Sequence, residues 1–191
     1  MKTNASELTT DGQAKKVLVA YYSRSGFTSA VAKRVARECN ADLLSIKDAR
    51  GRRGVRGYLR SSLEAALHMK AAIRSTVLRE NYDLVVIGTP VWFWNISSPV
   101  RAFIALHRPE FKRLAFFCTY GGSGAAKVLG DMEALCGIHP VATLALRDEE
   151  IHRGLDGDKF ADFTTRLNGS VKHSTSKASS AAVGVNVLAH S

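Results

Sequence analysis

Hydrophobic residues along the chain gather in five short runs, and a stretch of helical periodicity follows each run. The first run, residues 16–22, is apolar almost throughout, as expected for a strand buried on both faces of a sheet. The same reasoning predicts four further strands, at residues 41–46, 82–88, 113–120 and 140–146. Because these runs do not alternate between apolar and polar positions, they favour a parallel sheet with helices on both faces.

The segments between the predicted strands carry the spacing of amphipathic helices. After the first strand, Val31, Val35 and Cys39 recur every fourth residue while charged residues fill the opposite face. Other segments predict a helix from near Tyr58, a helix over 99–107 capped by Ser97 or Ser98, and helices over 125–136 and 160–167. Regular alternation of strand and helix predicts a single doubly wound α/β domain.

The two ends of the chain lack this alternation. Residues 1–14 are polar and unpatterned, and residues 169–191 are rich in serine, alanine and other small residues. We therefore expect a flexible N-terminal lead-in over 1–14, one domain over 15–168, and a flexible tail over 169–191.

Composition narrows the class and the compartment. The chain has 191 residues, of which 46% are hydrophobic and 23% charged, and this excludes a disordered protein. No apolar run approaches the roughly 18 residues of a membrane span, and the N-terminal stretch has no signal-peptide core. Three cysteines without metal-site spacing predict free thiols. These features predict a cytoplasmic protein with no membrane span and no metal site.

The formal net charge of +10 indicates an affinity for anions. Arginines concentrate in residues 50–60, where they alternate with glycines. A solvated basic surface is the alternative explanation. Because no nucleic-acid motif or aromatic stacking series accompanies the arginines, nucleic acid is an unlikely partner.

A small polar cluster, SRSGFT at residues 23–28, separates the first strand from the first helix. Backbone N–H groups and the partial positive charge of a helix N-terminus favour an anion at such a place. Helix capping alone needs one hydroxyl, whereas this segment has three hydroxyls and a glycine in six residues. The segment therefore predicts a phosphate site, although neither the Walker pattern nor the dinucleotide fingerprint is present.

Two further loops follow the third and fourth strands, at the edge where parallel α/β sheets bind ligands. Residues 89–95 place three aromatic side chains in a row, and residues 119–124 combine a tyrosine with paired glycines. Aromatic faces and exposed backbone suit a planar ring. The alternative is that some of these aromatic residues fold back into the core.

The segment 23–28 fits the pattern S-x-[ST]-G-x-T, and with the two loops it gives residues 15–168 a resemblance to the flavodoxin family. The resemblance implies a five-stranded parallel sheet in the order 2-1-3-4-5 and a non-covalently bound flavin mononucleotide, FMN. The phosphate would be bound by Ser23, Arg24, Ser25, Gly26, Phe27 and Thr28. The isoalloxazine ring would be flanked by Thr89, Pro90, Val91, Trp92, Phe93, Trp94, Asn95, Thr119, Tyr120, Gly121, Gly122, Ser123 and Gly124. Trp92 is the residue expected to meet the ring.

Two functions follow from the resemblance. The first is an electron carrier that exchanges electrons with a redox partner protein through FMN. The second is an FMN-dependent NAD(P)H:quinone or porphyrinogen-type oxidoreductase with a small-molecule acceptor. A basic interaction module without flavin is a third alternative. The residues single out no catalytic side chain, and the strongly basic charge differs from that of typical acidic electron carriers.

Overall fold

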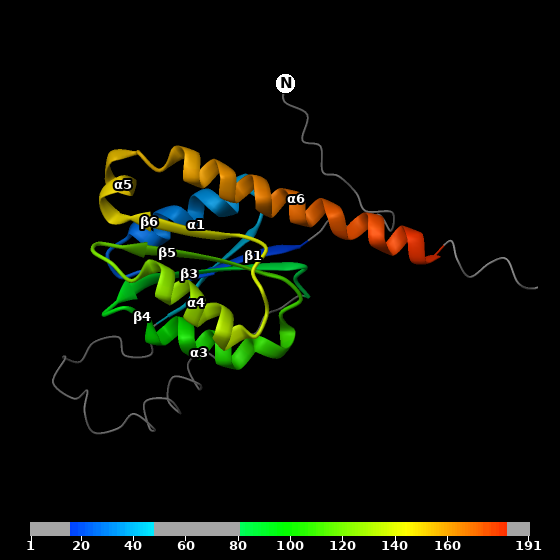
Figure 1. Cartoon of the computed structure of the whole chain (residues 1–191), viewed down its shortest axis with the longest axis horizontal. Coiled ribbons are helices and arrows are strands. Elements are labelled where there is room, and N and C mark those ends of the chain that lie inside the picture. The colour runs from blue at the N-terminus through cyan, green and yellow to red at the C-terminus, as the bar shows by residue number, and fades with distance from the viewer. Residues whose placement is uncertain (1–15, 48–80, 183–191) are drawn as a thin grey trace, which may run out of the picture.

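A parallel β-sheet forms the centre of the protein and lies between two layers of helices (Figure 1). The computed structural model describes residues 16–47 and 81–182. Within these ranges, five parallel strands follow the order β2-β1-β3-β5-β6 across the sheet. Their bounds are β1 (Val17–Tyr21), β2 (Asp42–Ser45), β3 (Leu84–Trp92), β5 (Leu114–Tyr120) and β6 (Thr143–Arg147).

The order of the parallel strands agrees with the sequence-based prediction. Counted along the chain without β4, the order is 2-1-3-4-5, and β1 pairs in parallel with both β2 and β3. The number of strands differs from the prediction, since the described residues form six strands rather than five. The additional strand is β4 (Asn95–Ile96), which pairs antiparallel with the end of β3. The doubly wound α/β class is confirmed.

Strand β3 is longer than predicted, because residues 89–92 continue it beyond Gly88. Pro90 is compatible with this central position because β1 has already ended there, with Tyr21 opposite Gly88. The Val85 N–H donates to the Arg113 carbonyl on the β5 side. Because successive N–H groups along a strand point to opposite neighbours, position 90 faces the β1 side, where β1 has already ended. No ladder hydrogen bond is therefore lost at Pro90.

Helices from the described ranges cover both faces of the sheet (Figure 1). Helices α1 (Phe27–Glu38) and α6 (Gly157–Ala182) lie on one face, and α3 (Ser98–His107) and α4 (Ala125–Cys136) lie on the other. Neighbouring residues of β3 alternate between the two cores: Val86 packs on the α1 side and Ile87 on the α3 side. Because both faces are buried, the strands are apolar throughout, as the sequence indicates.

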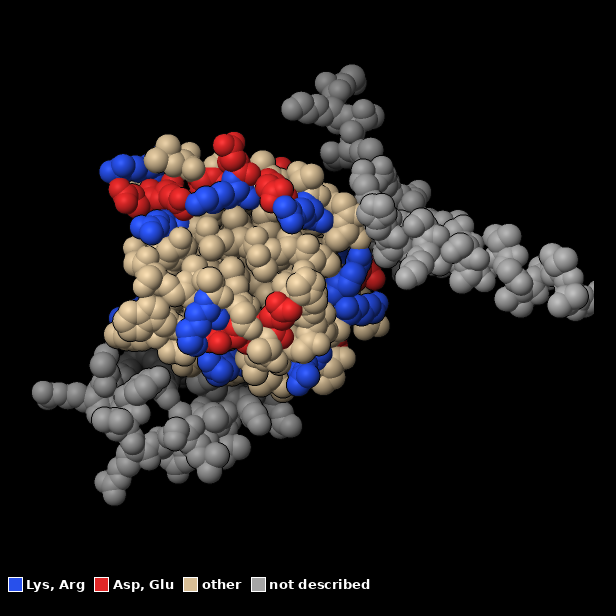
Figure 2. Space-filling model, viewed as in Figure 1, with Lys and Arg blue, Asp and Glu red and all other residues tan. Residues whose placement is uncertain are grey.

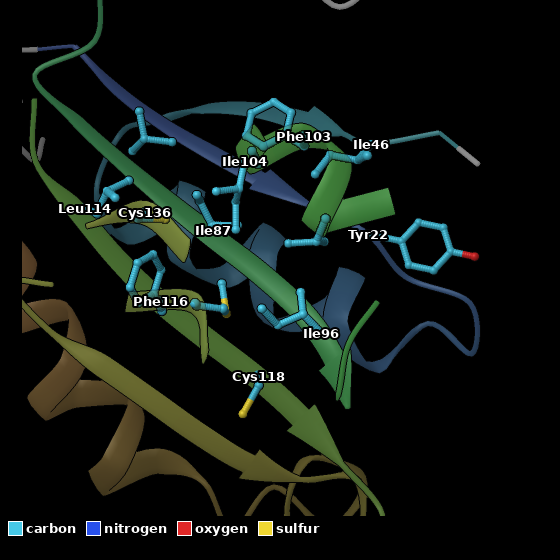
Figure 3. Close-up of a cluster of buried hydrophobic side chains, with 14 of the residues drawn as sticks. Tyr22, Ile46, Ile87, Ile96, Phe103, Ile104, Leu114, Phe116, Cys118 and Cys136 are labelled. Carbon is cyan, nitrogen blue, oxygen red and sulfur yellow. The ribbon is translucent and has the colours of Figure 1, made fainter. Parts of the chain in front are cut away.

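Figure 3 shows the core cluster beneath α3 and α4. Phe103 and Ile104 of α3 belong to this cluster together with Ile87 and Phe116 of the sheet. Burial of each large apolar side chain of this kind stabilises the fold by about 1.5–3 kcal/mol. Cys118 is fully buried here, and burial raises the pKa of its thiol to about 12, so the thiol is uncharged at neutral pH.

Helix α4 has the predicted bounds, and α3 begins one residue before the predicted segment. Ser97 occupies the N-cap position of α3, but its side chain makes no capping hydrogen bond. Its hydroxyl lies 2.9 Å from the hydroxyl of Thr89, which is buried beside it. The predicted capping role of the Ser97 side chain is therefore wrong. Two short elements were not predicted, namely α5 (Asp148–Arg153) and the 3-10 helix η2 (Arg108–Glu110).

Helix α6 is tied to α1 at its start. Arg34 of α1 forms an ion pair with buried Asp156, and its guanidinium carbon lies 4.1 Å from the centroid of the Phe160 ring. The helix then continues to Ala182, so residues 169–182 are helical where the sequence predicted a flexible tail. This segment contains no proline and several alanines, which favour helix.

The domain limits at residues 15 and 168 stay predictions. The lead-in over 1–14, the helix predicted from near Tyr58 and the arginine-rich segment 50–60 lie outside the described residues. None of the helices within 16–47 and 81–182 is long and apolar enough to cross a membrane.

Candidate functional site

The loop after β1 turns back on itself and leads directly into α1. Gly26, at the N-cap of the helix, has a φ of 102°, in the left-handed region that glycine adopts readily. Its N–H donates a hydrogen bond to the hydroxyl of Ser23 at 3.1 Å, which closes the loop. Arg24, Ser25 and Gly26 are exposed to solvent. The loop thus presents three of the predicted phosphate-binding residues on the surface.

The first turn of α1 offers backbone donors to an anion. The first helical hydrogen bond runs from the Ala30 N–H to the Gly26 carbonyl at 2.9 Å. The N–H groups of Phe27, Thr28 and Ser29 therefore have no acceptor within the helix. The first turn contains no acidic side chain, and the helix dipole adds partial positive charge there. This end of α1 has the chemistry of a phosphate site.

The Thr28 side chain is buried rather than presented to solvent. Its hydroxyl lies 2.8 Å from the hydroxyl of Thr119, at the carboxyl end of β5. Thr119 was predicted on the ring side of the site and is buried as well. The Thr28 hydroxyl therefore fastens α1 to β5, and the backbone N–H is the group of Thr28 that an anion can use.

The second predicted loop is a β-hairpin with a turn of two aromatic residues. Strand β3 ends at Trp92, Phe93 and Trp94 form the turn, and Asn95 pairs back with Trp92. Phe93 and Trp94 have φ values of 47° and 58°, so both turn residues are left-handed, as in a type I′ turn. Bulky residues adopt this conformation at a cost of order 1–3 kcal/mol each. The Asn95 side-chain amide donates to the Phe93 carbonyl at 2.7 Å and braces the turn.

A hollow of about 240 Å³ opens between this hairpin and the third predicted loop. It is lined by Val91, Phe93, Trp94, Tyr120, Gly121, Gly122 and Ser123. The Trp94 indole N–H donates to the Ser123 hydroxyl at 2.9 Å and so joins the two loops. Gly124, with a φ of 97°, lies against the indole so closely that a Cβ there would come within 2.5 Å of Trp94 Cδ1. The two segments predicted to flank a ring therefore meet in space.

Trp92, the residue expected to meet the ring, does not line this hollow. Its ring packs edge to face on Tyr22, with centroids 5.4 Å apart and an interplanar angle of 88°. Tyr22 immediately precedes the phosphate loop, so Trp92 supports the region between the two halves of the site. Thr89 and Pro90 lie in β3 directly before the hairpin and are buried. Seven of the thirteen predicted ring-side residues line the hollow, and the other six do not.

Two further residues at the same edge of the sheet, Arg147 and Asp148, were not predicted from the sequence. The Arg147 guanidinium carbon lies 5.6 Å from the centroid of the Tyr120 ring, and these two residues are opposite one another in the β5–β6 pair. A carboxylate oxygen of Asp148 lies 3.8 Å from where a Cβ on Gly121 would stand, and burial raises the pKa of this carboxyl. Arg147 and Asp148 directly follow the predicted strand at 140–146, and this position at the ligand-binding edge could have indicated them.

Charge on the face seen in Figure 2 is mixed, since Lys and Arg lie among Asp and Glu rather than forming one basic patch. Over α5 and the start of α6 these charges pair, as Arg153 with Glu149 at 2.9 Å and Lys159 with Glu150 at 2.6 Å. Within the part of the chain that the structure describes, no three His, Cys, Asp or Glu side chains form a possible metal site.

The two halves of the site fit the cofactor that the family resemblance implies. The exposed first turn of α1 can donate to one phosphate group, and the aromatic-lined hollow can take a flat ring. A Cβ built on Gly26 or Gly122 would meet no atom within 4 Å, so both loops leave open space for a ligand. Both halves lie at the carboxyl edge of the sheet, where doubly wound proteins bind ligands.

Comparison with known proteins gives matches in sequence and in structure. The model of the flavodoxin family matches residues 16–144. An NAD(P)H dehydrogenase (quinone) from Cupriavidus metallidurans is 34% identical over 89 residues, which cover 47% of this chain and 45% of that relative. The match thus spans less than half the length of this relative.

Solved structures share the fold at low sequence identity. A flavoprotein in complex with FMN from Lactobacillus acidophilus is 23% identical with a TM-score of 0.52, over 73% of this chain and 98% of that one. A flavodoxin, WrbA-like protein from Agrobacterium tumefaciens is 15% identical with a TM-score of 0.55, over 83% and 98% of the two chains. Because the family model covers more than half of the sequence, the chain belongs to the flavodoxin family of FMN-binding proteins.

Proposed function

We propose that the chain binds one FMN non-covalently and transfers electrons through it. The observation that carries this proposal is the pairing of the acid-free N-terminus of α1 with an aromatic-lined hollow at the same sheet edge. A helix N-terminus of this kind accommodates one phosphate group, which suits a mononucleotide. Bound FMN would supply the redox chemistry, since a flavin accepts and donates electrons singly or in pairs.

The residues of the chain would bind and orient the cofactor. The N–H groups of the first turn of α1 and the exposed hydroxyl of Ser25 would hold the phosphate. Trp94 and Tyr120 would contact the ring from the two sides of the hollow. The hydrogen bond from Trp94 to Ser123 joins the two loops that line it. Because Trp92 packs on Tyr22, we assign the principal ring contact to Trp94.

The test is to purify the full chain, release any flavin by heat, and identify it chromatographically. Titration of the flavin-free protein with FMN, riboflavin and FAD then gives the relative affinities. We expect one FMN per chain and weaker binding of riboflavin and FAD. Release of FAD would contradict the proposal of an FMN site. Failure of the protein to bind any added flavin would also contradict it and would favour a basic interaction module without flavin.

An enzyme is the second candidate. The sequence similarity to an NAD(P)H dehydrogenase (quinone), which covers 47% of this chain, favours it. In this case a nicotinamide cofactor would supply electrons, and a quinone or a porphyrinogen-type molecule would be the small-molecule partner. Steady-state oxidation of NADH or NADPH by the FMN-loaded protein, with and without a quinone, separates the enzyme from an electron carrier. A carrier would show no such turnover and would need a redox partner protein.

We propose the cytoplasm as the compartment. Cys39, Cys118 and Cys136 are all free thiols, and a reducing environment keeps thiols in this state.

A further inference from the structure

Phe93 is the most exposed of the large hydrophobic side chains that the structure describes, although it lines the hollow. Its relative exposure is 89%, whereas Trp94 next to it is 57% exposed and is held by Ser123 and Gly124. Among the described residues, the Phe93 ring joins neither core cluster and pairs with no other aromatic ring. Packing within the described fold therefore does not explain a phenylalanine at this position.

The backbone also disfavours phenylalanine here. Phe93 is the first residue of a two-residue turn with a φ of 47°, a position that asparagine and glycine occupy most easily. The hydrogen bond from the Asn95 amide and the attachment of Trp94 hold the turn in place. Strained backbone positions cluster at ligand contacts and active sites, and this one carries a large apolar side chain that stays exposed.

We propose that Phe93 is the stacking surface for a flat aromatic electron acceptor of the quinone class, at the mouth of the hollow. This inference rests on the proposed binding of FMN and on its enzymatic form. The face of a phenylalanine ring favours a planar, uncharged aromatic partner in offset stacking. Arg147, 5.6 Å from the Tyr120 ring that lines the hollow, adds positive charge at this edge. This charge favours acceptor oxygens that gain electron density during reduction.

The overall reaction balances with NAD(P)H as the reductant. NAD(P)H gives up a hydride, water supplies one proton, and the quinone takes two electrons and two protons on its carbonyl oxygens to become a hydroquinone. Phe93 exchanges neither electrons nor protons in this reaction. Phe93 positions the acceptor and makes the site selective for a flat molecule.

The experiment compares two acceptors on the FMN-loaded full chain. One is a two-ring naphthoquinone, which can stack, and the other is ferricyanide, a compact inorganic ion that cannot. Phe93→Asn removes the ring and suits the left-handed turn, and Phe93→Tyr keeps a ring. Leu155→Asn is the matched control, because Leu155 is also an exposed large hydrophobic residue and does not line the hollow. The FMN dissociation constant and the urea midpoint are measured for every variant.

We expect Phe93→Asn to raise the KM for naphthoquinone about tenfold and to lower the preference for naphthoquinone over ferricyanide by the same factor. Phe93→Tyr should restore the preference, and Leu155→Asn should not alter it. An unchanged preference in Phe93→Asn would overturn the inference. A tenfold rise of its FMN dissociation constant would also overturn it, because Phe93 would then contact the cofactor. If the protein binds FMN but reduces no quinone, this inference fails and FMN binding stands; if it binds no FMN, both fail.

Discussion

The hydroxyl of Thr28 lies 2.8 Å from the hydroxyl of Thr119, in the interior between the start of α1 and the end of β5. Thr28 belongs to the phosphate side of the site, and Thr119 begins the loop on the ring side. One buried hydrogen bond therefore connects the two halves of the site. It fixes the helix whose N-terminus would bind the phosphate relative to the strand that carries Tyr120.

Thr28→Val keeps the shape of the side chain but leaves the Thr119 hydroxyl buried without this partner. We expect the free energy of unfolding to fall by about 1–3 kcal/mol, the usual cost of an unsatisfied buried polar group. The double variant Thr28→Val with Thr119→Val should lose less than the sum of the two single variants. Urea denaturation measures all three, and strictly additive losses would show that the two hydroxyls do not depend on each other.

Ser25→Ala should weaken FMN binding more than riboflavin binding. The exposed Ser25 hydroxyl can donate to the charged phosphate, and a hydrogen bond to a charged group contributes about 1.5–3 kcal/mol. We therefore expect a loss of about ten- to a hundredfold in FMN affinity, measured by titration of the flavin-free protein. Thr165→Ala, at an exposed position of α6, serves as control. Equal losses for both ligands would assign Ser25 to folding rather than to the phosphate.

Trp94→Leu should weaken FMN and riboflavin by the same factor, because both ligands carry the ring. An aromatic pair contributes about 0.5–1.5 kcal/mol beyond buried area, so a loss of roughly three- to tenfold is expected. Trp92→Leu should have the smaller effect, since Trp92 packs on Tyr22. The opposite ranking would restore the sequence-based prediction that Trp92 meets the ring.

Gly88→Ala should destabilise the protein, and Gly130→Ala should stabilise it. A Cβ on Gly88 would lie 2.0 Å from the ring of Phe117, so the central strands would have to shift, at a typical cost of 1–3 kcal/mol. Gly130 lies inside α4, where a Cβ would meet no atom within 4 Å, and alanine favours helix by up to about 1 kcal/mol. Thermal unfolding of both variants is the measurement, and shifts of the same sign would contradict this assignment.

Stability should fall at alkaline pH, in part because of Cys118. Burial raises the pKa of this thiol from about 9.0 to about 12, so the folded chain keeps the proton after the unfolded chain has lost it. Its contribution is fully present below pH 9 and is lost toward pH 12, with a slope of at most about 1.4 kcal/mol per pH unit. Cys118→Ala should show a shallower decline in urea midpoints between pH 9 and 11. An identical decline would contradict the assignment.

The sequence predicted the elements whose signal is local. Strand β5 was predicted from an unbroken apolar run, and helix α4 was predicted from a regular helical spacing of apolar residues. The parallel order of the strands came from the family resemblance. The candidate phosphate loop could be proposed from the sequence because its glycine and hydroxyl residues lie next to each other in the chain.

The hairpin was missed because its turn uses Phe93 and Trp94 where asparagine and glycine are the usual signal. The direction of the Thr28 hydroxyl depends on Thr119, which lies 91 residues away in the sequence. The different surroundings of Trp92 and Trp94 are likewise not visible in the sequence, since Trp92 packs on Tyr22 whereas Trp94 lines the hollow. Such choices depend on tertiary contacts that no local pattern records.

The helices on the α1 side of the sheet come from opposite ends of the described chain, and this has a consequence for synthesis. Val31 and Val35 of α1 are made early, whereas Phe163 and Leu167, which complete the same core cluster, are made only after the last strand of the sheet. On the other side of the sheet, both helices that the structure describes, α3 and α4, have been made once Cys136 has been added to the chain. A nascent chain therefore closes one side of its sheet first and carries the other side open until α6 emerges. During that interval the α1 side is the surface on which a chaperone would act.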